Sequence, residues 1–233
     1  MQPSAMILAA GLGTRLRPLT LTTPKPLVKV DGITLLDRTL IHVREGGLTS
    51  CVINTHYLPD AMRRAIANIH DLTIHTSYEP VLLDSGGGVK NALVYLPCDI
   101  LFLLNADTFF AYQQQPLLAQ LLMQWDPGRM DALLYLVPQH GAIGHEGGGD
   151  FEVHADGTLT RARGDETLIF TGIQLIKKSF YETDPRSIFS VNDLWNQMIN
   201  MGRLHGCIGD GSWYHISTPA SLLAAEEHLR MQA

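Results

Sequence analysis

The sequence is poor in cysteine and has no two cysteines at the spacing of a zinc or redox motif. Its three cysteines, Cys51, Cys98 and Cys207, lie far apart, and such a sparse set fits reduced thiols in a cytosol. Long hydrophobic runs are also missing: Ala5–Ala10 reaches six residues, whereas a membrane helix needs about 20. The N-terminus lacks the basic region of a signal peptide. We therefore expect a cytoplasmic protein without a membrane partner.

Basic residues are outnumbered, with 17 Lys and Arg against 23 Asp and Glu, which gives a net charge of −6. A chain this acidic is unsuited to non-specific binding of nucleic acid, so we expect no nucleic-acid partner. Any phosphate must then be bound locally, by individual basic side chains and backbone amides. The length of 233 residues predicts one domain with a substantial core.

Short apolar runs alternate with segments of helical periodicity, which is typical of α/β proteins. The first half predicts strands over residues 5–10, 50–54, 72–78 and 100–105, and helices over residues 34–45, 59–70 and 87–96. The second half predicts strands over residues 131–137, 167–175 and 212–216, a hairpin over residues 151–163, and helices over residues 191–201 and 219–231. We expect a single-domain, Rossmann-like, mostly parallel but mixed sheet with helices on both faces.

The most informative segment follows the first predicted strand, where ligands bind in such sheets. It reads LAAGLGTRLRPLT over Leu8–Thr20 and continues with PKPL over Pro24–Leu27. Its glycines allow the backbone to approach a ligand and to direct amides at phosphate oxygens. Arg15 adds a fork of donors, and Lys25 adds a point charge between two prolines. The segment lacks both the GK[ST] of a Walker loop and the third glycine of a dinucleotide fingerprint.

This segment resembles the signature of the sugar-1-phosphate nucleotidylyltransferases, roughly LAAGxGTRLxPLT followed by PKPLV. The resemblance continues through Asp84–Gly88, Asn105–Asp107, Phe170–Gly172 and Trp213–Pro219. The short chain, the glycine triplet and Gly149–Phe151 look most like the bacterial N-acetylmuramate-1-phosphate uridylyltransferases of cell-wall recycling. The resemblance implies a glycosyltransferase-A-like fold with a nucleotide-binding half over about residues 1–110 and a sugar-binding half over about residues 111–233.

The reaction that this resemblance implies converts an NTP, preferably UTP, and a sugar 1-phosphate into an NDP-sugar and pyrophosphate, with Mg²⁺ as cofactor. The sugar phosphate oxygen attacks the α-phosphorus in line, so positioning and charge neutralisation must supply the rate. One alternative is guanylyl transfer to a mannose- or heptose-type 1-phosphate. Another is a regulatory protein that binds a nucleotide sugar and turns over weakly.

The resemblance also assigns roles by position. The catalytic residues are Arg15 and Lys25, and the metal ligands are Asp107 and His215. The nucleotide-binding set is Leu8, Ala9, Ala10, Gly11, Gly13, Thr14, Arg15, Asp84, Gly86 and Gly87. The sugar-binding set is Asn105, Gly149, Glu166, Thr171 and Gly172.

Two segments depart from the pattern of the family. Where many relatives carry Glu-Lys-Pro, whose lysine meets the sugar phosphate, this chain has only Arg161 and Arg163 nearby, so the contact is absent or passes to one of them. Where relatives carry a second metal-binding aspartate, this chain has His215. Mg²⁺ is then held mainly by Asp107 and the substrate phosphates, or Asp210 substitutes, or His215 bonds to a metal-bound water or a phosphate.

Overall fold

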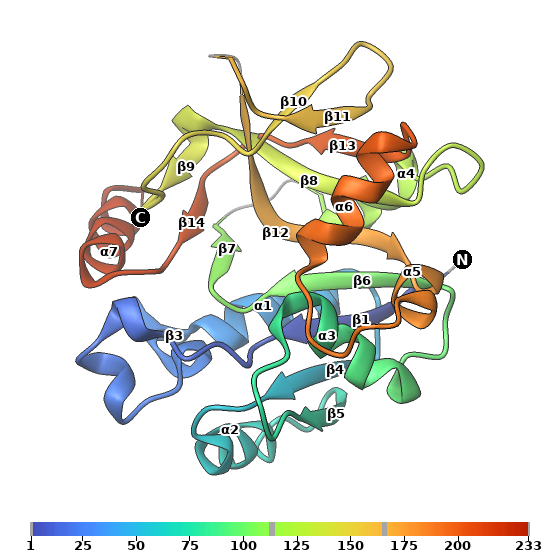
Figure 1. Cartoon of the computed structure of the whole chain (residues 1–233). Coiled ribbons are helices and arrows are strands. Elements are labelled where there is room, and N and C mark those ends of the chain that lie inside the picture. The colour runs from blue at the N-terminus through green and yellow to red at the C-terminus, as the bar shows by residue number, and fades with distance from the viewer. Residues whose placement is uncertain (1, 112–114, 165–166, 233) are drawn as a thin grey trace.

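The computed structural model describes residues 2–111, 115–164 and 167–232, and a nine-stranded sheet runs through its centre (Figure 1). Its longest continuous path contains β5 (Thr73–Tyr78), β4 (Ser50–Thr55), β1 (Ser4–Leu8), β6 (Ile100–Asn105), β12 (Leu168–Lys177), β10 (Phe151–Val153) and β11 (Leu159–Arg161). Two more strands, β8 (Ala132–Pro138) and β13 (Leu204–Ile208), extend the sheet beside β12. The predicted α/β fold with a mixed sheet is confirmed.

Strand direction explains where a site can form. Strands β5, β4, β1 and β6 are parallel to one another, whereas β12 is antiparallel to both β6 and β8. The carboxyl ends of the four parallel strands therefore meet at one edge of the sheet, the position where ligands bind in α/β folds. Leu8, Thr55 and Asn105 mark this edge as the last residues of their strands.

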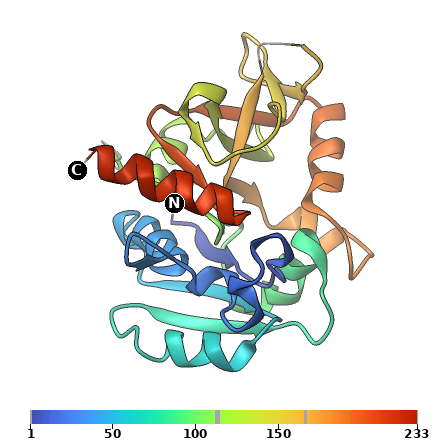
Figure 2. The same cartoon turned by 90° about the vertical axis from the view of Figure 1, so that its left-hand side faces the viewer.

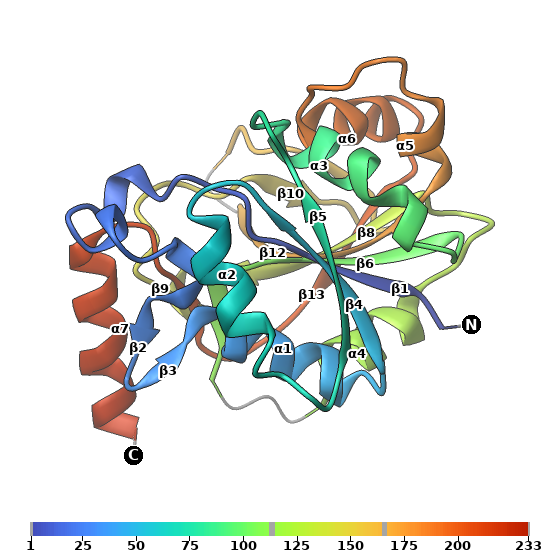
Figure 3. The same ribbon diagram turned by 90° about the horizontal axis from the view of Figure 1, so that it is seen from below.

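Helices cover both faces, because neighbouring residues of a strand point to opposite sides. In β1, Ala5 and Ile7 belong to the core under α1 (Leu35–Glu45), α2 (Pro59–Ile66) and α4 (Leu117–Gln124). Met6 belongs to the core under α3 (Asp84–Ala92), α5 (Ser179–Thr183) and α6 (Val191–Asn200). Figure 3 shows α3, α5 and α6 on one side of the sheet and α1 and α4 on the other.

A small third core brings the end of the chain to its beginning. Strand β14 (Trp213–His215) pairs with β7 (Thr108–Phe110) and β9 (Ala142–Ile143), so that His215 lies opposite Thr108. Helix α7 (Pro219–Gln232) packs through Ala225 and Leu229 into a cluster that contains Leu16, and Figure 2 shows it in front of the N-terminal segments. The short ribbon of β2 (Lys29–Val30) and β3 (Ile33–Thr34) joins the same cluster.

Local signals explain which predicted boundaries match. Helix α1 begins where the capping pattern predicts, because the Thr34 hydroxyl accepts a hydrogen bond from the Asp37 N–H at 3.0 Å. Helix α2 ends at Ile66, four residues before the predicted end. Helix α3 was expected over residues 87–96 but begins at Asp84, so the glycine triplet lies inside the helix. No helix of the described residues is long and apolar enough to cross a membrane.

Candidate active site

A first cavity of about 220 Å³ lies beyond the carboxyl ends of β1 and β6. Its wall contains residues from both parts of the predicted phosphate-binding segment together with Asn105 and Asp107. The lining residues are Leu8, Ala9, Gly11, Gly13, Thr14, Arg15, Lys25, Pro26, Asn105, Ala106, Asp107 and Ser217. The fold therefore brings Arg15, Lys25 and Asp107 around one cavity, as expected from strands that end at the same edge.

The loop after β1 folds tightly against the segment that carries Lys25. Gly13 has a φ of +61°, and a Cβ at this position would lie 3.0 Å from Thr20 and 3.1 Å from the Cβ of Lys25. The Thr20 hydroxyl donates to the Gly13 carbonyl at 2.7 Å and fixes this contact. Glycine is needed here both for its conformation and for the close approach that places Lys25 beside the loop.

Lys25 and Asp107 form an ion pair in the wall of the first cavity. The Lys25 Nζ lies 2.7 Å from Asp107 Oδ2, with side chains 13% and 28% exposed. Burial raises the pKa of Asp107, but the charge and the hydrogen bond of Lys25, together with the nearby His215 ring, outweigh burial and hold the pKa below its ordinary value. Asp107 is therefore an anion at neutral pH and holds the ammonium group of Lys25 beside the cavity.

His215 is a second neighbour of the Asp107 carboxylate. Its Nε2 is 3.9 Å from Asp107 Oδ2, and its ring stacks on Trp213 with centroids 5.6 Å apart. Burial lowers the pKa of His215 more than the charge of Asp107 raises it, so the ring is neutral at pH 7. The structure thus brings the two predicted metal ligands together, whereas Asp210 is exposed and does not line the first cavity.

The oxygen ligands of this wall fit Mg²⁺ only in part. Within the described residues, no group of three His, Cys, Asp or Glu side chains could hold a metal ion. Asp107 supplies one carboxylate, and the neutral imidazole of His215 is a poor ligand for Mg²⁺. One carboxylate together with substrate phosphates is nevertheless a common Mg²⁺ site, so the wall suits an ion that arrives with the nucleotide.

A second cavity of about 600 Å³ adjoins the first and shares Leu8, Gly11 and Asn105 with it. Its other lining residues are Ala10, Asn54, Glu79, Leu82, Asp84, Ser85 and Ile188. Ala10 and Asp84 belong to the predicted nucleotide-binding set. The exposed side chains of Leu82 and Ile188 provide apolar surface, which suits a planar base.

The polar floor of the second cavity is a chain of hydrogen bonds that the sequence analysis missed. The Asn54 side chain accepts from the Ala9 N–H at 2.6 Å and donates to Glu79 Oε1 at 2.7 Å. The fully buried Glu79 also accepts from the Leu83 N–H at 3.1 Å. Both residues lie near the carboxyl ends of β4 and β5, the same signal that identified Asp107 at the end of β6.

The predicted nucleotide contacts Gly86 and Gly87 are buried and do not line the second cavity. Their N–H groups donate to the Phe189 carbonyl at 2.9 and 3.1 Å. A Cβ at Gly86 would lie 2.4 Å from the Phe189 ring, and one at Gly87 would lie 2.3 Å from the Ser187 carbonyl. These glycines allow the segment 187–189 to pack on α3, and in this way they place Ile188 at the cavity.

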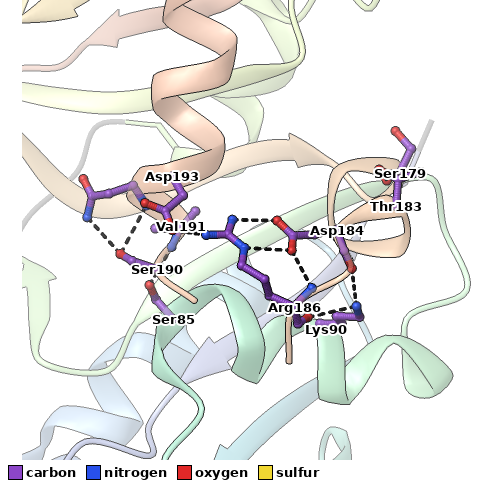
Figure 4. A network of polar contacts seen from close by, with 10 residues as sticks. Ser85, Lys90, Ser179, Thr183, Asp184, Arg186, Ser190, Val191 and Asp193 are labelled. Carbon is purple, nitrogen blue, oxygen red and sulfur yellow. Dashed lines mark hydrogen bonds and ion pairs between the residues drawn. The ribbon is translucent and has the colours of Figure 1, made fainter. Parts of the chain in front are cut away.

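Ion pairs hold this segment in place (Figure 4). Arg186 contacts Asp184 at 2.7 Å and Asp193 at 2.6 Å. Lys90 of α3 donates to the Arg186 carbonyl at 2.9 Å, and the Val191 N–H donates to the Ser85 hydroxyl at 3.0 Å. The first turn of α6 is therefore fixed against α3.

A third cavity of about 240 Å³ shares Leu8 and Asn105 with the other two. Its remaining lining residues are Ser85, Asp150, Phe151, Arg161, Phe170, Gln174, Val191, Asn192 and Trp195. Among the described members of the predicted sugar-binding set, only Asn105 lines it. The sequence analysis missed Trp195 and Asn192, since α6 joins the cavity through tertiary contacts alone.

Gly149, Thr171 and Gly172 do not line the third cavity but pack closely against neighbouring segments. A Cβ at Gly172, which has a φ of +87°, would lie 2.8 Å from the Cβ of Asn105, and one at Gly149 would lie 2.3 Å from the Thr167 hydroxyl. Thr171 is fully buried and donates to the Tyr135 carbonyl at 2.7 Å. Glu166 lies outside the described residues.

Comparison with known proteins identifies the family to which this chain belongs. Residues 4–140 match the family model described as nucleotidyl transferase, and the chain is 32% identical over 232 residues to the N-acetylmuramate alpha-1-phosphate uridylyltransferase of Caulobacter vibrioides. That match covers 97% of this chain and 96% of the relative. The chain belongs to the nucleotidyl transferase family. Members of this family use an NTP and a sugar 1-phosphate, so sugar-1-phosphate nucleotidyl transfer is the activity that these matches support.

Two further matches differ in extent. The chain is 33% identical over 138 residues to the mannose-1-phosphate guanylyltransferase of Mycobacterium tuberculosis, which covers 58% of this chain and 37% of that protein. The crystal structure of HddC from Yersinia pseudotuberculosis superposes with a TM-score of 0.79 at 20% identity and covers 97% of this chain and 99% of HddC. The last match confirms the single α/β fold with a mixed sheet.

Proposed function

We propose that the protein transfers the uridylyl group of UTP to N-acetylmuramate 1-phosphate and releases pyrophosphate, in cell-wall recycling. The observation that carries this proposal is the continuity of the three cavities, which all share Leu8 and Asn105. A nucleotide can then lie with its phosphates in the first cavity and its base in the second, while the sugar lies in the third. The 1-phosphate of the sugar then reaches the α-phosphorus of the nucleotide near Asn105.

The residues of the first cavity suit an in-line attack that needs no covalent nucleophile. The backbone of Gly11–Thr14 faces the phosphates, and Arg15 offers its fork of donors to the β- and γ-phosphates. Lys25, held by Asp107, neutralises charge that develops around the α-phosphate. When Mg²⁺ is bound, Asp107 would hold it, and the ion would neutralise charge on the phosphates.

We assign the base and the sugar from the matches to relatives and not from the size of the cavities. At about 600 Å³ the second cavity has room for a purine, so its volume does not select uracil. The uridylyltransferase match covers 97% of this chain and 96% of the relative at 32% identity. A mannose-1-phosphate guanyltransferase also matches 94% of this chain, at 29% identity, but over only 62% of its own length. The higher identity and the agreement in length over both chains support the uridylyltransferase assignment.

A substrate panel tests the proposal. Pyrophosphate release is measured with UTP or GTP against the 1-phosphates of N-acetylmuramate, N-acetylglucosamine and mannose. We expect the highest kcat/KM for UTP with N-acetylmuramate 1-phosphate, and no release when Mg²⁺ is chelated. A preference for GTP with mannose 1-phosphate would instead support the guanylyltransferase alternative. Nucleotide-sugar binding without pyrophosphate release for any pair would support a regulatory protein.

A further inference from the structure

Among the described residues, Arg161 is the one arginine that lines the third cavity. It lies at the end of β11, and its guanidinium packs 4.8 Å above the Phe151 ring and 5.8 Å from the Trp195 ring. These two rings limit where the guanidinium can move. Arg161 also lines another cavity, of about 430 Å³, whose wall includes Arg163.

The hydrogen bonds of Arg161 orient the guanidinium but do not neutralise it. Its Nε donates to the Asn196 side chain at 3.0 Å, and its Nη2 donates to the Asn192 side chain at 2.9 Å. Both acceptors are neutral amide oxygens, and among the described residues Arg161 forms no ion pair within 4.0 Å. A cation in a partly buried cavity without a contacting carboxylate favours an anionic ligand.

Asp150 is the acidic residue in the same wall, and it is already engaged. Its Oδ2 accepts the Phe170 N–H at 2.8 Å, so the carboxylate is partly compensated by the backbone. Burial lowers the pKa of Arg161, and Asp150 only partly opposes this effect. The guanidinium therefore remains the less well compensated of the two charges.

Arg161 lies apart from the residues proposed to bind the reacting phosphates. Arg15, Lys25 and Asp107 line the first cavity, and Arg161 does not. The third cavity touches the first only through Leu8 and Asn105, so a sugar with its 1-phosphate near Asn105 would extend its ring and substituents toward Arg161. The first turn of α6, which carries Asn192, is fixed on α3 through Ser85 (Figure 4).

We propose that Arg161 is a specificity-determining residue that binds a carboxylate carried by the sugar, namely the carboxylate of the lactyl group that is ether-linked to N-acetylmuramate. This inference rests on the proposed function and adds the residue that distinguishes the acidic sugar from N-acetylglucosamine. The two sugars differ only in the lactyl group, so a residue that contacts this group affects one substrate and spares the other. A contact to the shared phosphate affects both equally.

Arg161→Gln and Arg161→Lys test this assignment with both sugar 1-phosphates and UTP. For Arg161→Gln we expect kcat/KM to fall about 10- to 100-fold with N-acetylmuramate 1-phosphate and less than threefold with N-acetylglucosamine 1-phosphate, the range for loss of a charge-assisted contact. Arg161→Lys keeps the charge and should restore part of the preference. Arg163→Gln is the matched control, since Arg163 is exposed and lies outside the third cavity, and it should leave the ratio of the two values unchanged.

Melting temperatures of all variants show whether each protein is folded at the assay temperature. A smaller folded fraction lowers both kcat/KM values equally, so it leaves the ratio of kcat/KM for the two sugar 1-phosphates unchanged. An equal loss with both substrates in Arg161→Gln, or no loss with either, would overturn the assignment while the proposed function stands. A wild-type protein that prefers an uncharged sugar 1-phosphate would refute the proposed function, and the role of Arg161 with it.

Discussion

Replacement of Lys25 by methionine probes the first cavity most directly, because methionine keeps much of the side-chain length and removes the charge. The ammonium group lies 2.7 Å from Asp107, and the side chain is mostly buried in the cavity wall. Removing one preorganised electrostatic donor from a phosphoryl-transfer site costs about 3 kcal/mol of transition-state stabilisation, which is roughly 100-fold or more in kcat/KM. We expect most of this loss in kcat, since Arg15 and the loop amides still bind the triphosphate.

The same substitution has a smaller and pH-dependent effect on folding. Losing one partner of a partly buried ion pair costs about 1 kcal/mol, or roughly 2–4 °C in Tm for a chain of this size. The pKa of Asp107 is lowered in the folded protein, so the pair stabilises the fold above the ordinary pKa of a carboxyl group and loses this contribution as the pH falls through the lowered pKa. The Tm difference between wild type and Lys25→Met should therefore be largest near pH 7 and shrink toward pH 3.

The assay combines pyrophosphate release, calorimetric titration with UTP and thermal melting. Lys29→Met is the control, because Lys29 is exposed on β2 and does not line the first cavity. A folded Lys25→Met protein with kcat within threefold of wild type would refute the role of Lys25. A higher Kd for UTP with an unchanged kcat would show that Lys25 stabilises the ground state and the transition state equally.

Three further outcomes follow from the structure. His215→Asp should lower the half-saturating Mg²⁺ concentration at fixed nucleotide, because it adds a carboxylate beside Asp107; an unchanged or higher value would refute the lost-ligand explanation. Gly86→Ala should lower the free energy of unfolding by about 1–3 kcal/mol, since its Cβ would lie 2.4 Å from Phe189, whereas Gly148→Ala meets nothing within 4 Å and should be close to neutral in urea denaturation. Competition between UTP and GTP should give the higher kcat/KM for UTP, and the reverse order would refute uridylyl transfer.

The sequence predicts the parallel half of the sheet and the first cavity well, because both depend on local signals. The strand over residues 100–105 has its predicted bounds, and the cap at Thr34 forms as expected. Arg15, Lys25 and Asp107 meet because parallel strands end at one edge, a rule that needs no knowledge of long-range packing. Asn54 and Glu79 follow the same rule and could have been included on that ground.

The third cavity could not be predicted in the same way. It depends on β12, which runs antiparallel to β6, and on α6, whose Asn192 and Trp195 reach the cavity only by packing across the sheet. The glycine triplet shows the same limit. A run of glycines at a helix start favours both a ligand close to the backbone and a neighbouring segment close to the backbone, and only the contact with Phe189 decides between them.

The charges around the first cavity also predict how Mg²⁺ would enter the proposed reaction. Lys25 and Asp107 neutralise each other, and His215 is neutral, so Arg15 leaves the wall with an excess of positive charge. Such a wall attracts a nucleoside triphosphate and has little affinity for a free divalent cation. We therefore expect Mg²⁺ to bind as its complex with the nucleotide, with Asp107 completing the coordination after the phosphates are in place. His215 does not line the first cavity but lies beside Asp107, so an aspartate at position 215 would offset the excess positive charge and would offer the free ion a second carboxylate.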